Sequence, residues 1–165
     1  MIELIFIIET NKQNNSDYMY IKSTLDYYYG QRVCGITPIY AKTKTELTKQ
    51  DSKIKKAIEQ CKKSQRTPIP IIVADYDREE FSNEVIINYC QKNNYDLIWM
   101  NTTIEDVYLK TKLKRSQDKH KYAQSFMQKK DKLLKELNNL SELEPLNHQQ
   151  SSNILLIIDK YITRK

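Results

Sequence analysis

The sequence predicts an α/β protein with a central, mainly parallel sheet of about four strands, flanking helices and a helical C-terminal extension. Short apolar runs alternate with helical patterns over the first two thirds of the chain, which is typical of repeated strand–helix units. Two glycines in 165 residues argue against an all-β protein with many tight turns. The length suits a single domain, and we expect its core over about residues 1–115 and the extension over about residues 116–165.

The first two strands and the helix between them follow from apolar runs and from residues that begin or end helices. Residues 4–8 are all apolar and predict a buried strand. Ser16 suits the N-cap of the next helix, and Gly30 suits its end. The second strand is expected at residues 36–41, at an edge of the sheet, because Pro38 lacks the amide hydrogen that a central strand needs.

The third strand is the clearest, since residues 69–74 are apolar throughout. In the helix expected before it, Thr43 and Glu46 have the spacing of a capping box, and this helix should end near residue 63. The helix expected after it has the apolar positions Phe81, Val85, Tyr89 and Cys90. The remaining expected elements are a strand at residues 97–100, a helix from near Glu105, a helix over about residues 117–140 and a last helix over about residues 151–162, which should dock on the core.

Several classes of protein are disfavoured by what the sequence lacks. It contains no glycine-rich phosphate-binding motif, which removes the simplest nucleotide-binding interpretations. Cys34, Cys61 and Cys90 are far apart and fit reduced thiols better than a zinc site or disulfides. The first residues do not have the pattern of a signal peptide, and no apolar run approaches the roughly 20 residues of a membrane-spanning helix. We therefore expect a cytoplasmic protein.

The formal net charge of +6 is concentrated in one segment. Between residues 110 and 135, ten lysines and arginines are opposed only by Asp118 and Asp131. Such a segment favours a polyanionic partner such as RNA or DNA, and the alternative is a solvated, lysine-rich helix face. The residues expected to hold a nucleic-acid backbone are Lys110, Lys112, Lys114, Arg115, Lys119 and Lys121.

Acidic residues follow three of the expected strands. Glu9 follows the first, Asp75 and Asp77 the third, and Glu105 comes just after the fourth. The carboxyl ends of parallel strands meet at one edge of a sheet, and alternation along an extended segment places Asp75 and Asp77 on the same side. Two carboxylates about 4 Å apart repel by roughly 4 kcal/mol at an effective dielectric constant of about 20. We therefore expect these four residues to hold Mg²⁺ or Mn²⁺, which prefer oxygen ligands, although a strand-end Asp can also simply cap the next helix.

Three segments add a family resemblance to this pattern. The first is Ile7-Ile8-Glu9 followed by residues 16–21, with the sequence Ser-Asp-Tyr-Met-Tyr-Ile; the second is Val-Ala-Asp-Tyr-Asp at residues 73–77. The third is residues 99–109, where an Asn, a Glu, an aromatic residue and a Leu have a characteristic spacing. Together they resemble Toprim domains, and among these the RloB-like and OLD-type proteins of bacterial phage defence. Where these domains usually have Gly after the first acid, this chain has Thr10.

The resemblance implies a Toprim-like, Rossmann-like fold and a metal-dependent nuclease that acts in abortive infection, in some systems beside a partner ATPase. By this resemblance Asp75 and Asp77 would bind the metal, Glu9 would act as general base or further ligand, and Glu105 would be a ligand or support one.

Other interpretations of the sequence stay open. One is a non-catalytic Toprim-like subunit that binds nucleic acid or a partner ATPase. Another is a metal-dependent phosphatase or receiver-like domain that acts on small phosphates. Asp17 is interpreted as an acid that stabilises the start of its helix, and not as a site residue.

Overall fold

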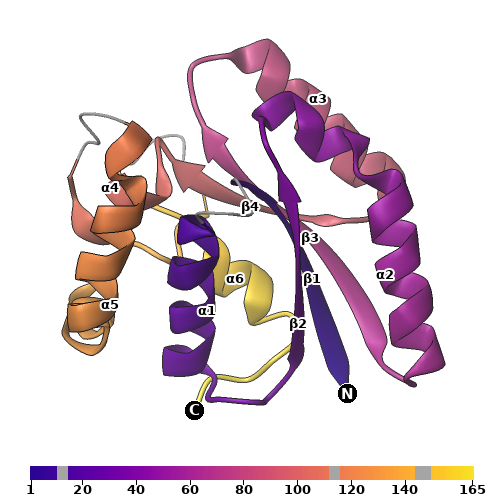
Figure 1. Ribbon diagram of the computed structural model, residues 1–165, viewed down its shortest axis with the longest axis horizontal. Coiled ribbons are helices and arrows are strands. Elements are labelled where there is room, and N and C mark those ends of the chain that lie inside the picture. The colour runs from indigo at the N-terminus through magenta and orange to yellow at the C-terminus, as the bar shows by residue number, and fades with distance from the viewer. Residues whose placement is uncertain (11–14, 112–115, 144–149) are drawn as a thin grey trace.

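The computed structural model describes residues 1–10, 15–111, 116–143 and 150–165 of the chain. A single sheet of four parallel strands lies between two layers of helices (Figure 1), as the alternating pattern predicted. The strands are β1 (Ile2–Glu9), β2 (Gly35–Ala41), β3 (Thr67–Tyr76) and β4 (Asp96–Asn101), and their order in the sheet is β2-β1-β3-β4. The expected α/β, Rossmann-like architecture is confirmed.

The helices divide between the two faces of the sheet. Figure 1 shows α1, α4, α5 and α6 on one face and α2 and α3 on the other. The helices are α1 (Ser16–Tyr28), α2 (Asp51–Lys63), α3 (Glu80–Asn93), α4 (Ile104–Leu109), α5 (Lys119–Glu136) and α6 (Ile154–Ile158), and the shorter 3₁₀ turns are η1 (Lys44–Lys49) and η2 (Ser116–Asp118).

An aromatic cluster joins the helices on the α1 face. Tyr20 of α1 is fully buried, and its ring centroid lies 4.5 Å from that of Phe126 in α5 and 5.1 Å from that of Tyr108 in α4. These rings pack over Leu4, Phe6 and Ile8, the alternate residues of β1 that face this side. The cluster therefore fixes α1, α4 and α5 relative to one another and to the sheet.

An ion pair between the buried Glu3 and the partly exposed Arg66 marks the amino end of the sheet. The Glu3 carboxylate accepts a hydrogen bond from Arg66 at 2.6 Å and another from the Thr37 hydroxyl at 2.7 Å. Gly35 lies beside it, and a Cβ atom at that position would overlap the Glu3 carboxylate. This glycine is therefore needed for close packing and not for a special backbone angle.

Several local expectations differ from the structure. The N-cap of α1 is Asn15 instead of Ser16, because the helix already includes the serine. The segment around Glu46 forms the separate 3₁₀ turn η1. The Glu46 carboxylate accepts a hydrogen bond from the Lys42 amide, whereas in a capping box it would accept one from the Thr43 amide. Phe81 is 80% exposed, since α3 packs on the sheet through Ile86 and Cys90.

The C-terminal extension docks on the α1 face as expected. Ile154, Leu155 and Ile158 of α6 are buried in the same core as the aromatic cluster, and Ser152 forms an isolated antiparallel bridge with Met100 of β4. The helix expected over residues 117–140 is confirmed as η2 and α5. In the described part of the chain, no helix has the length and apolarity needed to cross a membrane.

Candidate functional site

Glu105 is the most unusual acidic side chain in the structure. It lies in the first turn of α4, directly after β4, and is fully buried. Neither of its carboxylate oxygens has a well-formed hydrogen bond to a described residue, although the Thr103 side chain and the backbone of Glu105 itself are close enough to lower its pKa. Burial raises the pKa of this carboxyl group, and the nearby Lys119 ammonium lowers it in part. A buried carboxylate without partners is costly, so it indicates a place where a ligand or a cation is expected.

A strained turn holds Glu105 in this position. Thr102 has a φ of 72°, in the left-handed region that a β-branched residue rarely adopts. Its amide donates to the Tyr76 carbonyl at 3.2 Å, and its hydroxyl donates to the Asp106 carboxylate at 2.5 Å. Thr103 caps α4 by accepting from the Asp106 amide. The turn thus holds one carboxylate oxygen of Asp106, while the other oxygen of Asp106 and both oxygens of Glu105 have no well-formed hydrogen bond to a described residue.

Asp75 lies at the carboxyl end of β3. In the alternation of this strand it shares the α1 face with Ile71 and Val73. The side chain is half-buried, and burial raises its pKa well above the usual range, with a further contribution from the Asp17 carboxylate. The charges of Glu9 and Glu105 act in the same direction, and the charge of Lys119 opposes them.

Asp17 also belongs to this group, contrary to the interpretation of it as a helix-start residue alone. It is 6% exposed, it accepts a hydrogen bond from the Ser16 hydroxyl at 3.1 Å, and burial raises its pKa. Its charge raises the pKa of both Asp75 and Glu105. Because α1 begins just beyond the carboxyl end of β1, its first turn reaches the edge where the strand-end acids gather.

Lys119 supplies the positive charge of this acidic group. Its ammonium lies 4.0 Å from the Asp17 carboxylate, and the side chain is 28% exposed. Burial alone would lower its pKa, but the carboxylates of Asp17, Glu105, Asp75 and Glu9 outweigh burial and raise it. Lys119 therefore points toward the acids. The sequence had instead suggested that it holds a nucleic-acid backbone.

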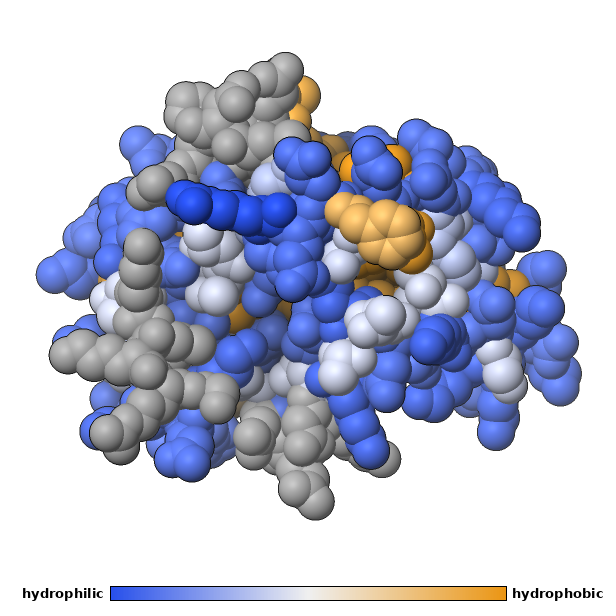
Figure 2. All heavy atoms as spheres, turned by 90° about the horizontal axis from the view of Figure 1, so that it is seen from above, coloured by the Kyte–Doolittle hydropathy of each residue, from blue (hydrophilic) through white to orange (hydrophobic). Residues whose placement is uncertain are grey.

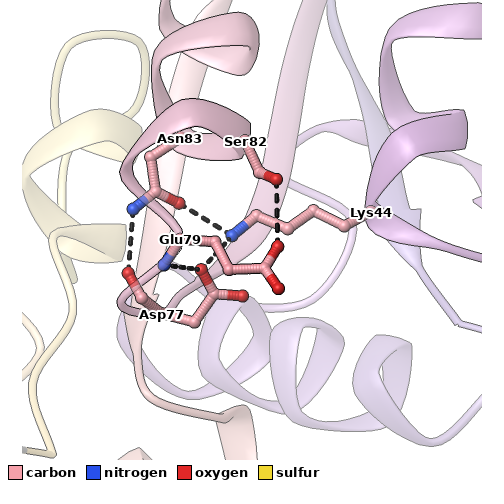
Figure 3. A network of polar contacts seen from close by, with 5 residues as sticks. All are labelled: Lys44, Asp77, Glu79, Ser82 and Asn83. Atoms are coloured by element: carbon pink, nitrogen blue, oxygen red, sulfur yellow. Dashed lines mark hydrogen bonds and ion pairs between the residues drawn. The ribbon is translucent and has the colours of Figure 1, made fainter.

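Asp77 takes part in a separate polar network (Figure 3). β3 ends at Tyr76, so the alternation expected from an extended strand does not continue to Asp77. Its carboxylate is 2.8 Å from the Lys44 ammonium and accepts the Glu79 amide at 3.1 Å. Lys44 also donates to the Asn83 amide oxygen at 2.7 Å. Asp77 is 44% exposed and has its own cation.

Glu9 is electrostatically coupled both to the acids around Lys119 and to the network of Asp77 and Lys44. It ends β1, it is half-buried, and burial raises its pKa. Both Lys119 and Lys44 lower that pKa, and both Asp17 and Asp77 raise it, so Glu9 is coupled to the acids on either side. Thr10 does not adopt a positive φ, so its backbone does not need a glycine.

The residues expected to bind metal thus form a divided arrangement. Asp75 and Glu105 are coupled on the α1 face together with Asp17, Asp77 pairs with Lys44, and Glu9 is coupled to both. Within the described ranges, no three His, Cys, Asp or Glu side chains are already placed to hold one metal ion. The chemistry of the donors still fits a hard cation, because every donor is a carboxylate and the oxygens of Glu105 have no partner.

The basic residues expected to bind nucleic acid are placed only in part. Lys110 is exposed at the end of α4, and Lys121 is exposed on α5, where it borders a cavity of about 230 Å³ with Tyr122. Seen from above, the surface is mainly hydrophilic (Figure 2). The other three predicted contacts, Lys112, Lys114 and Arg115, lie outside the described residues.

Sequence reasoning did not identify Asp17 or Tyr20 as members of the site. The Tyr20 hydroxyl is buried without a hydrogen-bond partner in the described structure, and Glu105 and Asp17 both raise its pKa, after burial. One available signal was the position of both residues in the first turns of α1, at the same edge of the sheet as the strand-end acids. Another was Lys119, a cation at the start of a helix, where the helix dipole disfavours it.

Comparison of the chain with protein-family models, with curated proteins and with solved structures gave no match.

Proposed function

We propose that this protein is a metal-dependent nuclease that hydrolyses phosphodiester bonds of RNA or DNA with Mg²⁺ or Mn²⁺. The observation that carries the proposal is the fully buried carboxylate of Glu105, which has no hydrogen-bond partner among the described residues and is coupled to Asp17. A purely structural carboxylate is normally hydrogen-bonded or paired when buried. Convergence of acids at the carboxyl edge of a parallel sheet, where α/β proteins bind ligands, supports the same conclusion.

Asp75, Glu105 and Asp17 would hold the cation, with Glu9 completing the set at the more exposed side. A bound divalent ion would offset negative charge on the phosphate and favour ionisation of a water molecule. Burial keeps the pKa of Glu9 above its ordinary value, which suits a group that accepts a proton from the attacking water. The Lys44 ammonium, positioned by its ion pair with Asp77, would form an ion pair with the substrate phosphate.

The exposed lysines of α5 would hold the rest of the nucleic acid without reading its sequence. Lys121, Lys129, Lys132 and Lys135 are all exposed on this helix. A role in phage defence and a partner ATPase are further parts of the proposal that rest on the Toprim resemblance alone.

The test is cleavage of tRNA, single-stranded DNA and plasmid DNA with Mn²⁺ or Mg²⁺. Cleavage by wild-type protein that is abolished by EDTA and lost in Asp75→Asn would support the proposal. Asp131→Asn makes the same chemical change at an exposed position of α5, about 18 Å along the helix from Lys119, and should cleave like wild type. Equal cleavage by Asp75→Asn and wild type would assign the activity elsewhere or to a contaminant.

The alternative function is a non-catalytic subunit that binds nucleic acid or a partner. Lys119 favours it, since its ammonium already compensates the acids without a metal. In that case no cleavage is expected under any condition, and nucleic-acid binding, measured by fluorescence anisotropy, should be unchanged by Asp75→Asn.

A further inference from the structure

The position of Lys119 is unfavourable for its own helix. It is the first residue of α5, a helix of 18 residues, where the partial positive charge of the helix dipole repels a cation. The adjacent Asp118 does not cap the helix with its side chain. An interaction outside the helix must therefore hold the side chain, and the only ion pair within 4.0 Å that it forms with a described residue is that with Asp17.

The acidic group needs a cation in order to stay together. Asp17 and Glu105 are almost completely buried, Asp75 is half-buried, and each is electrostatically coupled to Lys119. Carboxylates gathered in a poorly hydrated place repel one another, and burial penalises each charge further. One ammonium cannot hydrogen-bond every oxygen, and those of Glu105 have no well-formed hydrogen bond to any residue that the structure describes.

We propose that Lys119 is a built-in counter-ion that takes the place of the divalent cation in the metal-free protein and must leave when the metal binds. The inference rests on the proposed function, because it concerns the cation of that same site. An ammonium and a divalent ion among the same carboxylates repel each other, so the two compete. Loading of the metal would displace the Lys119 ammonium from the carboxylates toward solvent. The basic segment that begins at this helix would then have one more charge free for the polyanion, and only when the site holds its metal.

Direct binding of Mn²⁺, measured by calorimetry or by electron paramagnetic resonance, tests the competition without any substrate. Lys119→Gln should bind Mn²⁺ more tightly than wild type, by about tenfold or more, because the competing charge is gone. Lys121→Gln, which removes the same charge from an exposed position on the same helix, should stay within about twofold of wild type. Equal or weaker binding by Lys119→Gln would overturn the inference.

A second measurement uses the unmodified protein and does not depend on how the variant folds. Reductive methylation followed by peptide mass spectrometry reports how accessible each lysine amine is. Lys119 should be modified slowly without metal and several-fold faster at saturating Mn²⁺, while Lys121 serves as an internal reference. Unchanged modification of Lys119 at a concentration of Mn²⁺ that saturates the protein would refute its displacement.

The failure of this inference can be distinguished from the failure of the proposed function. If wild type and Lys119→Gln bind Mn²⁺ equally well, the metal site stands and the role of Lys119 is rejected. If neither protein binds Mn²⁺, the metal-dependent nuclease and the inference are both rejected. Binding by Lys119→Gln alone supports the inference and identifies Lys119 as the group that keeps the metal out.

Discussion

Removing the charge of Glu105 should stabilise the metal-free protein, although the residue is fully buried. The substitution Glu105→Gln keeps the size of the side chain and removes a charge that has no hydrogen-bond partner among the described residues. Leaving a buried polar group unsatisfied costs about 1–3 kcal/mol, and Lys119 offsets part of that cost here. We expect the free energy of unfolding to rise by about 1–2 kcal/mol at pH 7, which corresponds to roughly 2–8 °C in Tm for a protein of this size.

The gain should depend on pH in a defined direction. The folded-state pKa of Glu105 is raised, so the folded protein binds this proton more tightly than the unfolded chain does. At a pH below the ordinary pKa of Glu, about 4.3, both states are protonated and the variant should gain little. The difference from wild type should grow as the pH rises through the raised pKa and then stay constant.

Thermal unfolding followed by circular dichroism, in EDTA at several pH values, measures this difference. Glu136→Gln on the exposed surface of α5 is the matched control and should change stability by less than about 0.5 kcal/mol. A Glu105→Gln variant that is less stable than wild type at pH 7 would refute the reasoning. It would mean that Lys119 compensates the carboxylate fully and that the pair is a structural ion pair.

Three further outcomes follow from other contacts. Asp75→Asn should weaken Mn²⁺ binding, measured by calorimetry, by about tenfold or more. Asp77→Asn should weaken it much less, because Asp77 is exposed and paired with Lys44. The reverse order of the two effects would contradict the assignment of Asp75 to the metal site. Phe126→Ala should cost about 3–5 kcal/mol in urea unfolding, since it empties the aromatic cluster between α1, α4 and α5, and a loss below about 1 kcal/mol would mean that the cluster is not the core of this face. Gly35→Ala should cost roughly 1–3 kcal/mol in the same assay through overlap with the Glu3 carboxylate, and a neutral result would show that this carboxylate moves freely.

The sheet could be predicted from the sequence because each strand is a short apolar run bounded by polar residues. The edge position of β2 followed from Pro38, and the position of the strand-end acids followed from the parallel order of the strands. The exposed side of α3 could not be predicted in the same way. Of the expected apolar positions, Cys90 is buried against the sheet beside Ile86, whereas Phe81 and Val85 are exposed. Periodicity alone does not decide between two partly apolar faces.

The candidate site was predictable only where it lies on the strands. Asp77 follows β3 by one residue, and the period of two that placed it beside Asp75 holds only inside a strand. An acid in the first turn of a helix is explained by the helix dipole, so nothing in the sequence pattern assigned Asp17 to the site. Lys119 belongs to a basic segment, and its role depends on the packing of α5 against α1 and α4. These contacts are between residues that are distant in the sequence.

Two unfavourable features occur together on one turn, and this coincidence is difficult to explain by stability alone. Thr102 adopts a left-handed backbone conformation, and Glu105, three residues later, is buried without hydrogen bonds to any described residue. A stable turn needs neither, since Gly or Asn would relax the first and Gln would remove the buried charge of the second. Strain and unpaired polar groups persist where the surrounding fold enforces them, and such places are concentrated at binding and catalytic sites. If the cation is the missing partner, Mn²⁺ should raise the Tm of wild type more than that of Glu105→Gln; if Lys119 is the only partner, Mn²⁺ should raise neither.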